Sequence, residues 1–247
     1  MTAITSTLGH PKKSASLFRL GRLLSPCPAF DLFLPETDQR HRVTQYIAQQ
    51  FKVAHGANIH DFMPLLLTMQ CQGEISAVTG VRPAARHPLF LEQYLGQPVE
   101  DAISQVSGTA VMRHKLVEVG NLVATQAGAS QLLFLLLTAL LHRCDYDWVI
   151  FTGTPTVIKG LERLGFKLDR ICDADPARLQ NANLADWGSY YENRPQVVAG
   201  NVPAAIQTLQ NHKLYAGILA LLEQQITQLA PRFCELDLPY GTHALAA

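Results

Sequence analysis

The sequence lacks the signals that carry a chain across or into a membrane. Residues 11–24 are interrupted by four basic side chains, Lys12, Lys13, Arg19 and Arg22. A secretory signal needs about 7–15 uninterrupted apolar residues. The apolar run at residues 132–141 has about half of the ~20 residues that cross a bilayer. We therefore expect a cytoplasmic protein whose residues 1–28 form a flexible basic arm, which could make a peripheral membrane contact.

A large excess of either charge is also missing. Twenty basic side chains balance twenty acidic ones, so no overall field attracts nucleic acid and we expect no nucleic-acid partner. The nine histidines include no HExxH and no His/Cys cluster at ligand spacing, which predicts no metal site. No GxSxG is present, and this excludes the ordinary serine-hydrolase chemistry.

Cysteine is scarce, and its spacing suggests no pairs. The five cysteines lie at positions 27, 71, 144, 172 and 234 and form no CxxC motif. An odd number argues against a disulfide framework. We expect each of them to be a small core residue.

The segment 116–167 is the most informative part of what is present. Residues 116–123 form a short apolar run broken by Glu118 and Asn121, and residues 131–141 have the near-continuous hydrophobicity of a buried helix. A second strand follows at 147–152 and a second helix at 155–164, closed by Gly165. Two strands separated by such a helix should lie parallel. The pattern predicts an α/β fold with a mixed central sheet flanked by helices.

The other elements follow from periodicity and turn chemistry. We expect a first helix at 38–51 capped by Thr37 or Asp38. A hairpin is expected at 65–69 and 74–81, short helices at 90–95 and 99–103, and strands at 110–112, 167–172, 188–191 and 196–199. Residues 203–210 and 215–229 read as two amphipathic helices that could cover the sheet edge or form a homodimer contact. The predicted organisation is an arm at 1–28, one domain at 29–202 and C-terminal helices at 203–247.

Several motifs together resemble a known family. They are residues 33–35 with Arg40 and Arg42, then 55–57, 61–64, 89–95, 118–122, 160–166 and 187–191, within a region from about Phe30 to Leu209. The chain is similar to the thermostable hemolysin family, and its central segment resembles the GNAT acyltransferase core of acyl-homoserine-lactone synthases. The resemblance implies acyl transfer to a small-molecule amine. The implied donor is acyl-CoA or the phosphopantetheine of an acyl carrier protein, without a metal.

Glu118 is the candidate general base. It interrupts an apolar strand where a parallel GNAT-like sheet should splay, and burial there would raise its pKa toward neutral pH. In the lactone synthases the matching glutamate begins a Glu-x-x-Arg motif, whereas the fourth position here is Asn121. Asn121 cannot clamp a carboxylate or phosphate as arginine does. The alternative for Glu118 is a partly exposed carboxylate paired with Arg113 or Lys115.

The candidate donor site follows the same strand. Val123, Thr125, Gln126, Gly128 and Ser130 span the strand end and the loop where helix N–H groups could hold a phosphate, provided that Gly128 takes a positive φ. The loop departs from the usual glycine-rich GNAT pattern. An ordinary connection with Ser130 as the helix cap is the alternative, so the choice between CoA and a carrier protein stays open.

Further candidates lie at the second parallel strand and before the expected short helices. Thr152 or Thr154 could donate to a pantetheine amide or a substrate carbonyl, or form a plain turn before a helix that starts with proline. Arg82 could bind an acceptor carboxylate, or be a solvated strand-end charge. Phe90 and Tyr94, together with the Leu-rich helix, could line a pocket for a fatty acyl chain.

The predicted function is an N-acyltransferase that moves a fatty acyl group from a thioester to a small amine. Donor and acceptor would be held together, with Glu118 or a water that it positions taking the amine proton. Two alternatives remain at this stage. One is a membrane-active hemolysin, and the other is a catalytically silent GNAT-like binding module.

Overall fold

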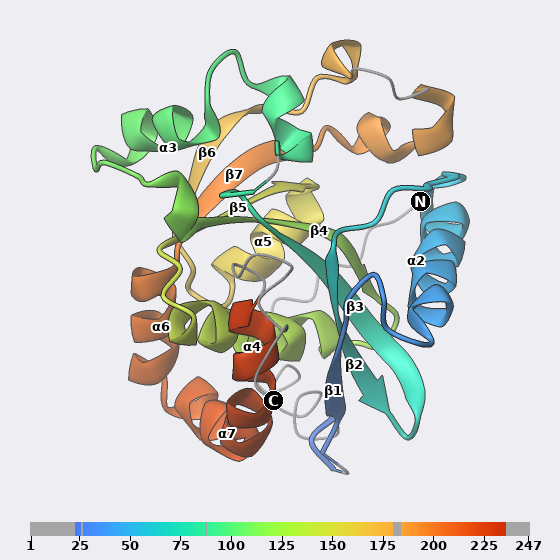
Figure 1. Ribbon diagram of the computed structural model, residues 1–247, viewed down its shortest axis with the longest axis vertical. Coiled ribbons are helices and arrows are strands. Elements are labelled where there is room, and N and C mark those ends of the chain that lie inside the picture. The colour runs from blue at the N-terminus through green and yellow to red at the C-terminus, as the bar shows by residue number, and fades with distance from the viewer. Residues whose placement is uncertain (1–22, 26, 87, 180–183, 236–247) are drawn as a thin grey trace, which may run out of the picture.

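A computed structural model describes residues 23–25, 27–86, 88–179 and 184–235 (Figure 1). Seven strands form one mixed sheet in the order β1-β2-β3-β4-β5-β7-β6. They are β1 (Ala29–Phe33), β2 (Leu65–Cys71), β3 (Glu74–Pro83), β4 (Leu116–Ala124), β5 (Trp148–Gly153), β6 (Leu168–Asp173) and β7 (Gln196–Asn201). The predicted α/β class with a mixed central sheet flanked by helices is confirmed.

The central segment folds as its pattern predicts. β4 and β5 are parallel neighbours, and the other neighbouring strands pair antiparallel. Helix α4 (Ala129–Arg143) connects β4 to β5, and α5 (Pro155–Glu162) follows β5. This strand–helix–strand unit places the carboxyl ends of two parallel strands at the same edge, the usual position of a binding site in such sheets.

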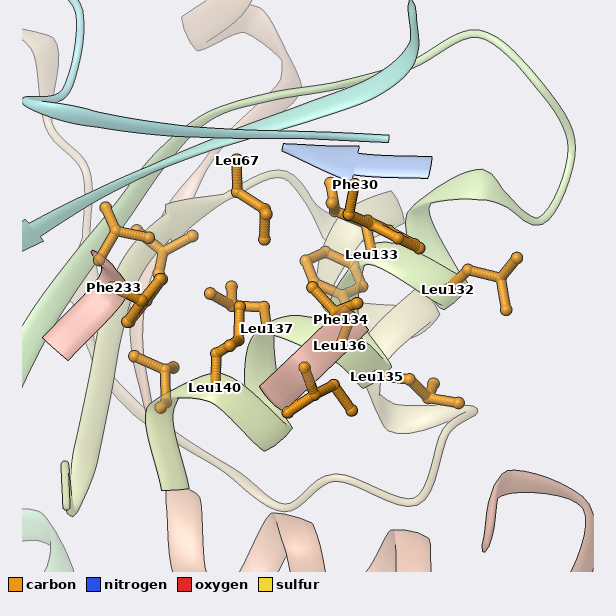
Figure 2. Packing of buried hydrophobic residues seen from close by; sticks show 14 of the residues in the cluster. Phe30, Leu67, Leu132, Leu133, Phe134, Leu135, Leu136, Leu137, Leu140 and Phe233 are labelled. Atoms are coloured by element: carbon orange, nitrogen blue, oxygen red, sulfur yellow. The ribbon is translucent and has the colours of Figure 1, made fainter. Parts of the chain in front are cut away.

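Helices cover both faces of the sheet. On one face α4 packs against α6 (Val202–Asn211) and α7 (Lys213–Cys234), as Figure 1 shows. On the other face α2 (Arg40–His55) lies over β3 and β4, and α3 (Val99–Ser107) lies beside β6. The leucine-rich α4 is buried on most of its surface because it is enclosed by the sheet and by α7 (Figure 2). The C-terminal helices therefore contribute to the main core, and residues 236–247 lie outside the described part.

β4 has a bulge in its pairing with β3, close to the point where its pairing with β5 ends. Gly80 pairs with Gly120 and Val78 with Val123, so two residues of β4 lie opposite Thr79 alone. Asn121 is one of these two residues and has a φ of 49°, a left-handed conformation that asparagine tolerates better than most side chains. Pairing between β4 and β5 ends at Val119 and Phe151, while both strands continue. The splay expected near Glu118 is therefore present.

Two short predicted strands are wrong. Residues 110–112 are tied to α3, since the backbone N–H of Val111 donates to Ser104 Oγ at 3.0 Å, and they lead into a 3-10 turn. Residues 188–191 lie in and between 3-10 helices η4 (Leu184–Trp187) and η5 (Tyr190–Asn193). There the Ser189 N–H donates to the His55 carbonyl at 2.8 Å. In both segments a contact with a helix replaces the strand ladder that β-prone residues suggest.

The predicted cap of the first helix is also wrong. The N-cap of α2 is Gln39, with a φ of 67° and no side-chain hydrogen bond. The Thr37 hydroxyl instead accepts a hydrogen bond from the Leu34 N–H at 2.9 Å. Its oxygen therefore closes the turn after β1 and does not cap α2.

Cysteine pairing departs from the sequence prediction. A disulfide joins Cys144, at the end of α4, to Cys234, at the end of α7. Cys27 is exposed, whereas Cys71 and Cys172 are partly buried. The two cysteines are far apart in the sequence, so their spacing did not predict that tertiary packing brings them to a Cα–Cα distance of 5.1 Å.

Replacing Cys144 and Cys234 together by serine should destabilise the protein. The bridge links residues 90 positions apart, and constraining a long loop in the unfolded chain contributes about 2–4 kcal/mol. Urea unfolding of the double variant should show this loss, with Cys71→Ser as a control that leaves the bridge intact. If all five cysteines of the denatured, unreduced protein reacted with a thiol reagent, the bridge would be absent.

Candidate active site

Two clefts of about 460 Å³ each meet where β4 and β5 separate. The first, here called the apolar cleft, runs along both strand edges and reaches α4, α5 and α6; its apolar lining includes Phe134, Leu137, Leu141, Phe151, Leu161 and Phe166. The second, here called the aromatic cleft, lies against residues 58–63 and 186–191; its Phe, Tyr and Trp side chains are Phe51, Phe62, Phe90, Tyr94, Trp187, Tyr190 and Tyr191. Val119, Gly120, Asn121 and Thr152 line both clefts, so the two spaces adjoin at the splay.

Thr152 marks this junction with an unsatisfied polar atom. Its Oγ1 is buried and has no hydrogen-bond partner in the described structure. Its backbone carbonyl accepts a hydrogen bond from the Tyr190 hydroxyl at 3.4 Å. A buried hydroxyl without a partner costs about 1–3 kcal/mol, and such atoms in native proteins call for an explanation such as a ligand group.

Glu118 lies on the aromatic cleft and is buried, with 2% of its surface exposed. Its Oε2 accepts the Phe90 N–H at 2.9 Å, and its Oε1 accepts the Leu91 N–H at 3.0 Å. The Arg82 guanidinium is 3.6 Å from Oε2. The two hydrogen bonds and the guanidinium position the carboxylate between β3 and the 3-10 helix η1 (Phe90–Tyr94).

Burial dominates the acidity of Glu118. Desolvation raises the pKa of this carboxyl to about 7, although Arg82 and the two backbone N–H groups favour the charged form. Two carboxylate oxygens offer about four lone-pair positions, so the two backbone N–H groups leave positions free to accept a proton. The group thus has the location and acidity of a base that works near neutral pH.

The expected alternative for Glu118 is wrong. Arg113 pairs with Glu92 and Glu100, and Lys115 pairs with Asp145. Strand pairing explains the difference, because Arg82 lies directly across the ladder from Glu118.

Asn121, the second predicted catalytic residue, lines both clefts and also positions a loop. Its Oδ1 accepts the Met63 N–H at 2.8 Å, which fixes residues 61–63 over the bulge. Gly80 and Gly120 leave the room that Met63 fills, because a Cβ on either glycine would overlap its side chain. One wall of the aromatic cleft therefore depends on the bulge and on two glycines.

The predicted phosphate loop lies beside the clefts and does not line them. Gly128 has the positive φ that the prediction required, 94°, and is the N-cap of α4. Ser130 lies inside α4, so its predicted capping role is wrong. The Thr125 hydroxyl contacts Tyr46 and the Ser76 carbonyl, and Gln126 is exposed. The loop follows directly on Ala124, a residue of the apolar cleft.

The remaining predicted residues divide between the two clefts. Val123 and Thr154 line the apolar cleft. Arg82, Phe90 and Tyr94 line the aromatic cleft, where the hydroxyls of Tyr94 and Tyr191 are hydrogen-bonded and burial raises the pKa of Tyr94. The sequence prediction combined Phe90 and Tyr94 with the Leu-rich helix in one lining, whereas the structure puts these sets in different clefts.

Sequence reasoning missed most of the aromatic cleft. Trp187 contacts the rings of Phe90, Tyr190 and Tyr191, with centroid distances of 5.6, 5.5 and 5.8 Å. Phe51 contacts Tyr190 at 6.4 Å. The only available signal was the concentration of Trp187, Tyr190 and Tyr191 in an otherwise polar stretch. These residues contributed to the family resemblance, but the sequence assigned them no function.

The described residues contain neither a candidate metal site nor a candidate membrane span. Among the described residues, no three His, Cys, Asp or Glu side chains are grouped so that they could hold a metal ion. No helix in the described ranges has the length and hydrophobicity to cross a membrane.

Comparisons with solved structures give likenesses at low sequence identity. The AHL synthase LasI has a TM-score of 0.48 and 12% identity, over 71% of this chain and 90% of that one. The CoA-dependent acyl-homoserine lactone synthase MesI has a TM-score of 0.45 and 15% identity, over 74% of this chain and 94% of that one. FeeM, an N-acyl amino acid synthase from uncultured soil microbes, has a TM-score of 0.47 and 15% identity, over 74% of this chain and 96% of that one. The sequence matches no curated protein.

The family comparison covers most of the chain. The model of the family described as thermostable hemolysin matches residues 34–206 of the 247. This range begins after β1 and ends within α6, so it contains Glu118, the bulge and the residues of both clefts up to Ala205. The chain belongs to the thermostable hemolysin family.

Proposed function

We propose that this protein is an N-acyltransferase that moves a fatty acyl group from a thioester donor to a small amine. The observation that carries the proposal is the junction of two clefts at the splay of β4 and β5, with a buried acid and an unpartnered hydroxyl beside it. A transfer enzyme must hold two substrates with their reacting atoms in contact. Two adjoining clefts of different chemistry meet that requirement.

The apolar cleft suits the donor. Beyond Val119 the edge of β4 is not paired with β5, so its backbone groups are available to the amides of a phosphopantetheine arm. Val123 and Thr154 line the same cleft. The apolar side chains toward α4 and α5 would hold the fatty acyl chain, and the α4 N-terminus at Gly128 would receive the phosphate of CoA or of an acyl carrier protein.

The aromatic cleft suits the acceptor. Glu118, or a water bound to it, takes a proton from the amine, and the amine nitrogen then attacks the thioester carbonyl carbon. The new C–N bond forms as the C–S bond breaks, and the sulfur leaves as a thiolate that takes up a proton. Thr152 Oγ1 donates a hydrogen bond to the carbonyl oxygen as negative charge develops there. The proposal places the protein in the cytoplasm with its donor.

The proposal is tested by following both products. Purified protein is incubated with a long-chain acyl-CoA or the matching acyl carrier protein, with and without a mixture of small primary amines. We expect amine-dependent release of CoA or of free carrier protein, measured by chromatography, and an acylated amine detected by mass spectrometry. Leakage of pure liposomes by the protein alone, with no release from either donor, would instead support the membrane-active alternative.

A further inference from the structure

The charged groups of the aromatic cleft are unevenly distributed. Its acidic side chains are Asp61, Glu118 and Asp186, whereas Arg82 is its only arginine or lysine among the described residues. Arg82 is already opposite Glu118. The cleft therefore holds two carboxylates more than it needs to balance its arginine.

Asp61 and Asp186 make no side-chain hydrogen bond or ion pair within the described part of the chain. Their backbone groups, in contrast, are held in place. The Asp61 carbonyl accepts a contact from Asn121 Nδ2 at 3.5 Å, and the Asp186 carbonyl accepts the Asn58 N–H at 2.6 Å. The carboxylates are thus presented by fixed backbone, with their own oxygens left for a ligand.

The aromatic side chains of the cleft favour a positively charged ligand as well. Aromatic faces attract ammonium groups by about 0.5–2 kcal/mol, more when water is excluded. Trp187, Tyr190 and Tyr191 form mutual ring contacts on the same cleft. Thr152 lines the cleft too, and its buried Oγ1 has no partner, so an unsatisfied hydroxyl lies beside the place where the reacting end of a ligand would bind.

We infer that the acceptor is an amine with a second positive charge, such as a diamine or polyamine, whose distal ammonium binds Asp61, Asp186 and the aromatic rings. This inference rests on the proposed function and names its substrate class. The near amine loses its proton to Glu118 and is acylated, while the far ammonium keeps its charge. A carboxylate at the far end would face two unpaired carboxylates, which is a means of rejecting amino acids.

The inference predicts a ranking of acceptors that share one chain length. With a fixed acyl thioester, 1,4-diaminobutane should have a kcat/KM about tenfold above that of butylamine, and 4-aminobutanoate should have the lowest value. The advantage of the diamine should shrink as salt rises, because exposed charges are screened. Released thiol, measured by chromatography, gives all three values.

Variants locate the recognised charge. Asp61→Asn and Asp186→Asn should each lower the ratio of kcat/KM for 1,4-diaminobutane to kcat/KM for butylamine about three- to tenfold. Asp101→Asn, on the exposed surface of α3, serves as the matched control. A higher kcat/KM for 4-aminobutanoate, or an unchanged diamine-to-butylamine ratio in both variants, would overturn the inference. Absence of thiol release with every amine would instead refute the proposed function itself.

Discussion

Glu118→Gln is expected to lower the rate of acyl transfer by about 10²- to 10⁴-fold. Glutamine preserves nearly the same volume but has no oxygen that can take up a proton at neutral pH. The buried carboxyl of Glu118 borders the cleft assigned to the acceptor, and burial raises its pKa to about 7. Single-turnover kinetics with acyl-CoA and an amine would measure the change without interference from product release.

The same substitution also has a structural cost. Both carboxylate oxygens accept backbone N–H groups, from Phe90 and Leu91, and the amide of glutamine supplies only one acceptor oxygen. One N–H would then face an NH₂ group, at a cost of about 1–3 kcal/mol. Glu92→Gln is the matched control, because Glu92 accepts the Leu89 N–H at 2.8 Å in the same 3-10 helix but lines neither cleft. Equal losses of activity in both variants would assign Glu118 a structural role.

The pH dependence separates a base from a structural acid. Transfer should decline as pH falls below about 7, where Glu118 becomes protonated. Arg82→Gln removes a charge that favours the carboxylate, so the midpoint of this decline should move to higher pH. A midpoint that stays in place in Arg82→Gln would contradict the assignment.

Stability should follow the same titration with a definite sign. The folded protein keeps the Glu118 proton up to a pKa of about 7, whereas the ordinary value is 4.5. The contribution of this group to the free energy of unfolding is therefore fully present below pH 4.5. It is lost, on the order of 3 kcal/mol, as pH rises to about 7. Urea unfolding should show this fall in the wild type and lack it in Glu118→Gln.

Membrane lysis by the Glu118→Gln variant provides an independent test of the proposed function. A protein that lyses membranes by inserting apolar surface should act on pure liposomes and tolerate the change of a buried carboxyl. An acyltransferase should lose its product together with any lysis that depends on that product. Liposome leakage caused by purified Glu118→Gln without donor or amine would contradict an enzymatic origin of lysis.

Thr152→Val should stabilise the fold and slow the reaction. Valine has nearly the shape of threonine and removes the buried Oγ1 that has no partner, which should raise the free energy of unfolding by about 1 kcal/mol. The same hydroxyl is the proposed donor to the thioester carbonyl, so its loss should lower kcat about 10- to 100-fold. Opposite signs for stability and activity distinguish a ligand-binding hydroxyl from a structural one.

Thr68→Val is the control for this prediction. Thr68 is a buried threonine of β2 whose hydroxyl has a partner, the Asp31 carbonyl at 3.4 Å, and it lines neither cleft. Its substitution should leave activity unchanged and should not stabilise the protein. If Thr152→Val reduced stability and left kcat at the wild-type value, the hydroxyl would have no role in transfer.

The strong local patterns were sufficient for the core of the fold. The apolar period of β4, the continuous hydrophobicity of α4 and the short run of β5 each reflect burial along a single element, so neighbouring residues contain the whole signal. The same apolar pattern singled out Glu118 as a candidate site residue, because a charged side chain within a buried strand is unusual whatever lies opposite it. The parallel pairing of β4 and β5 then follows from the length of the helix between them.

Contacts between segments far apart in the sequence were decided only by the tertiary structure. The partners of Glu118 come from β3 and η1, the Cys144–Cys234 bridge joins α4 to α7, and the rings of the aromatic cleft come from four separate segments. No local period encodes such pairings, because each residue involved satisfies its own element equally well without them. Local sequence thus determined that two parallel strands flank the apolar helix and that an acid interrupts the first of them. Long-range packing determined that the acid is buried, that Arg82 faces it, and that two clefts meet beside it.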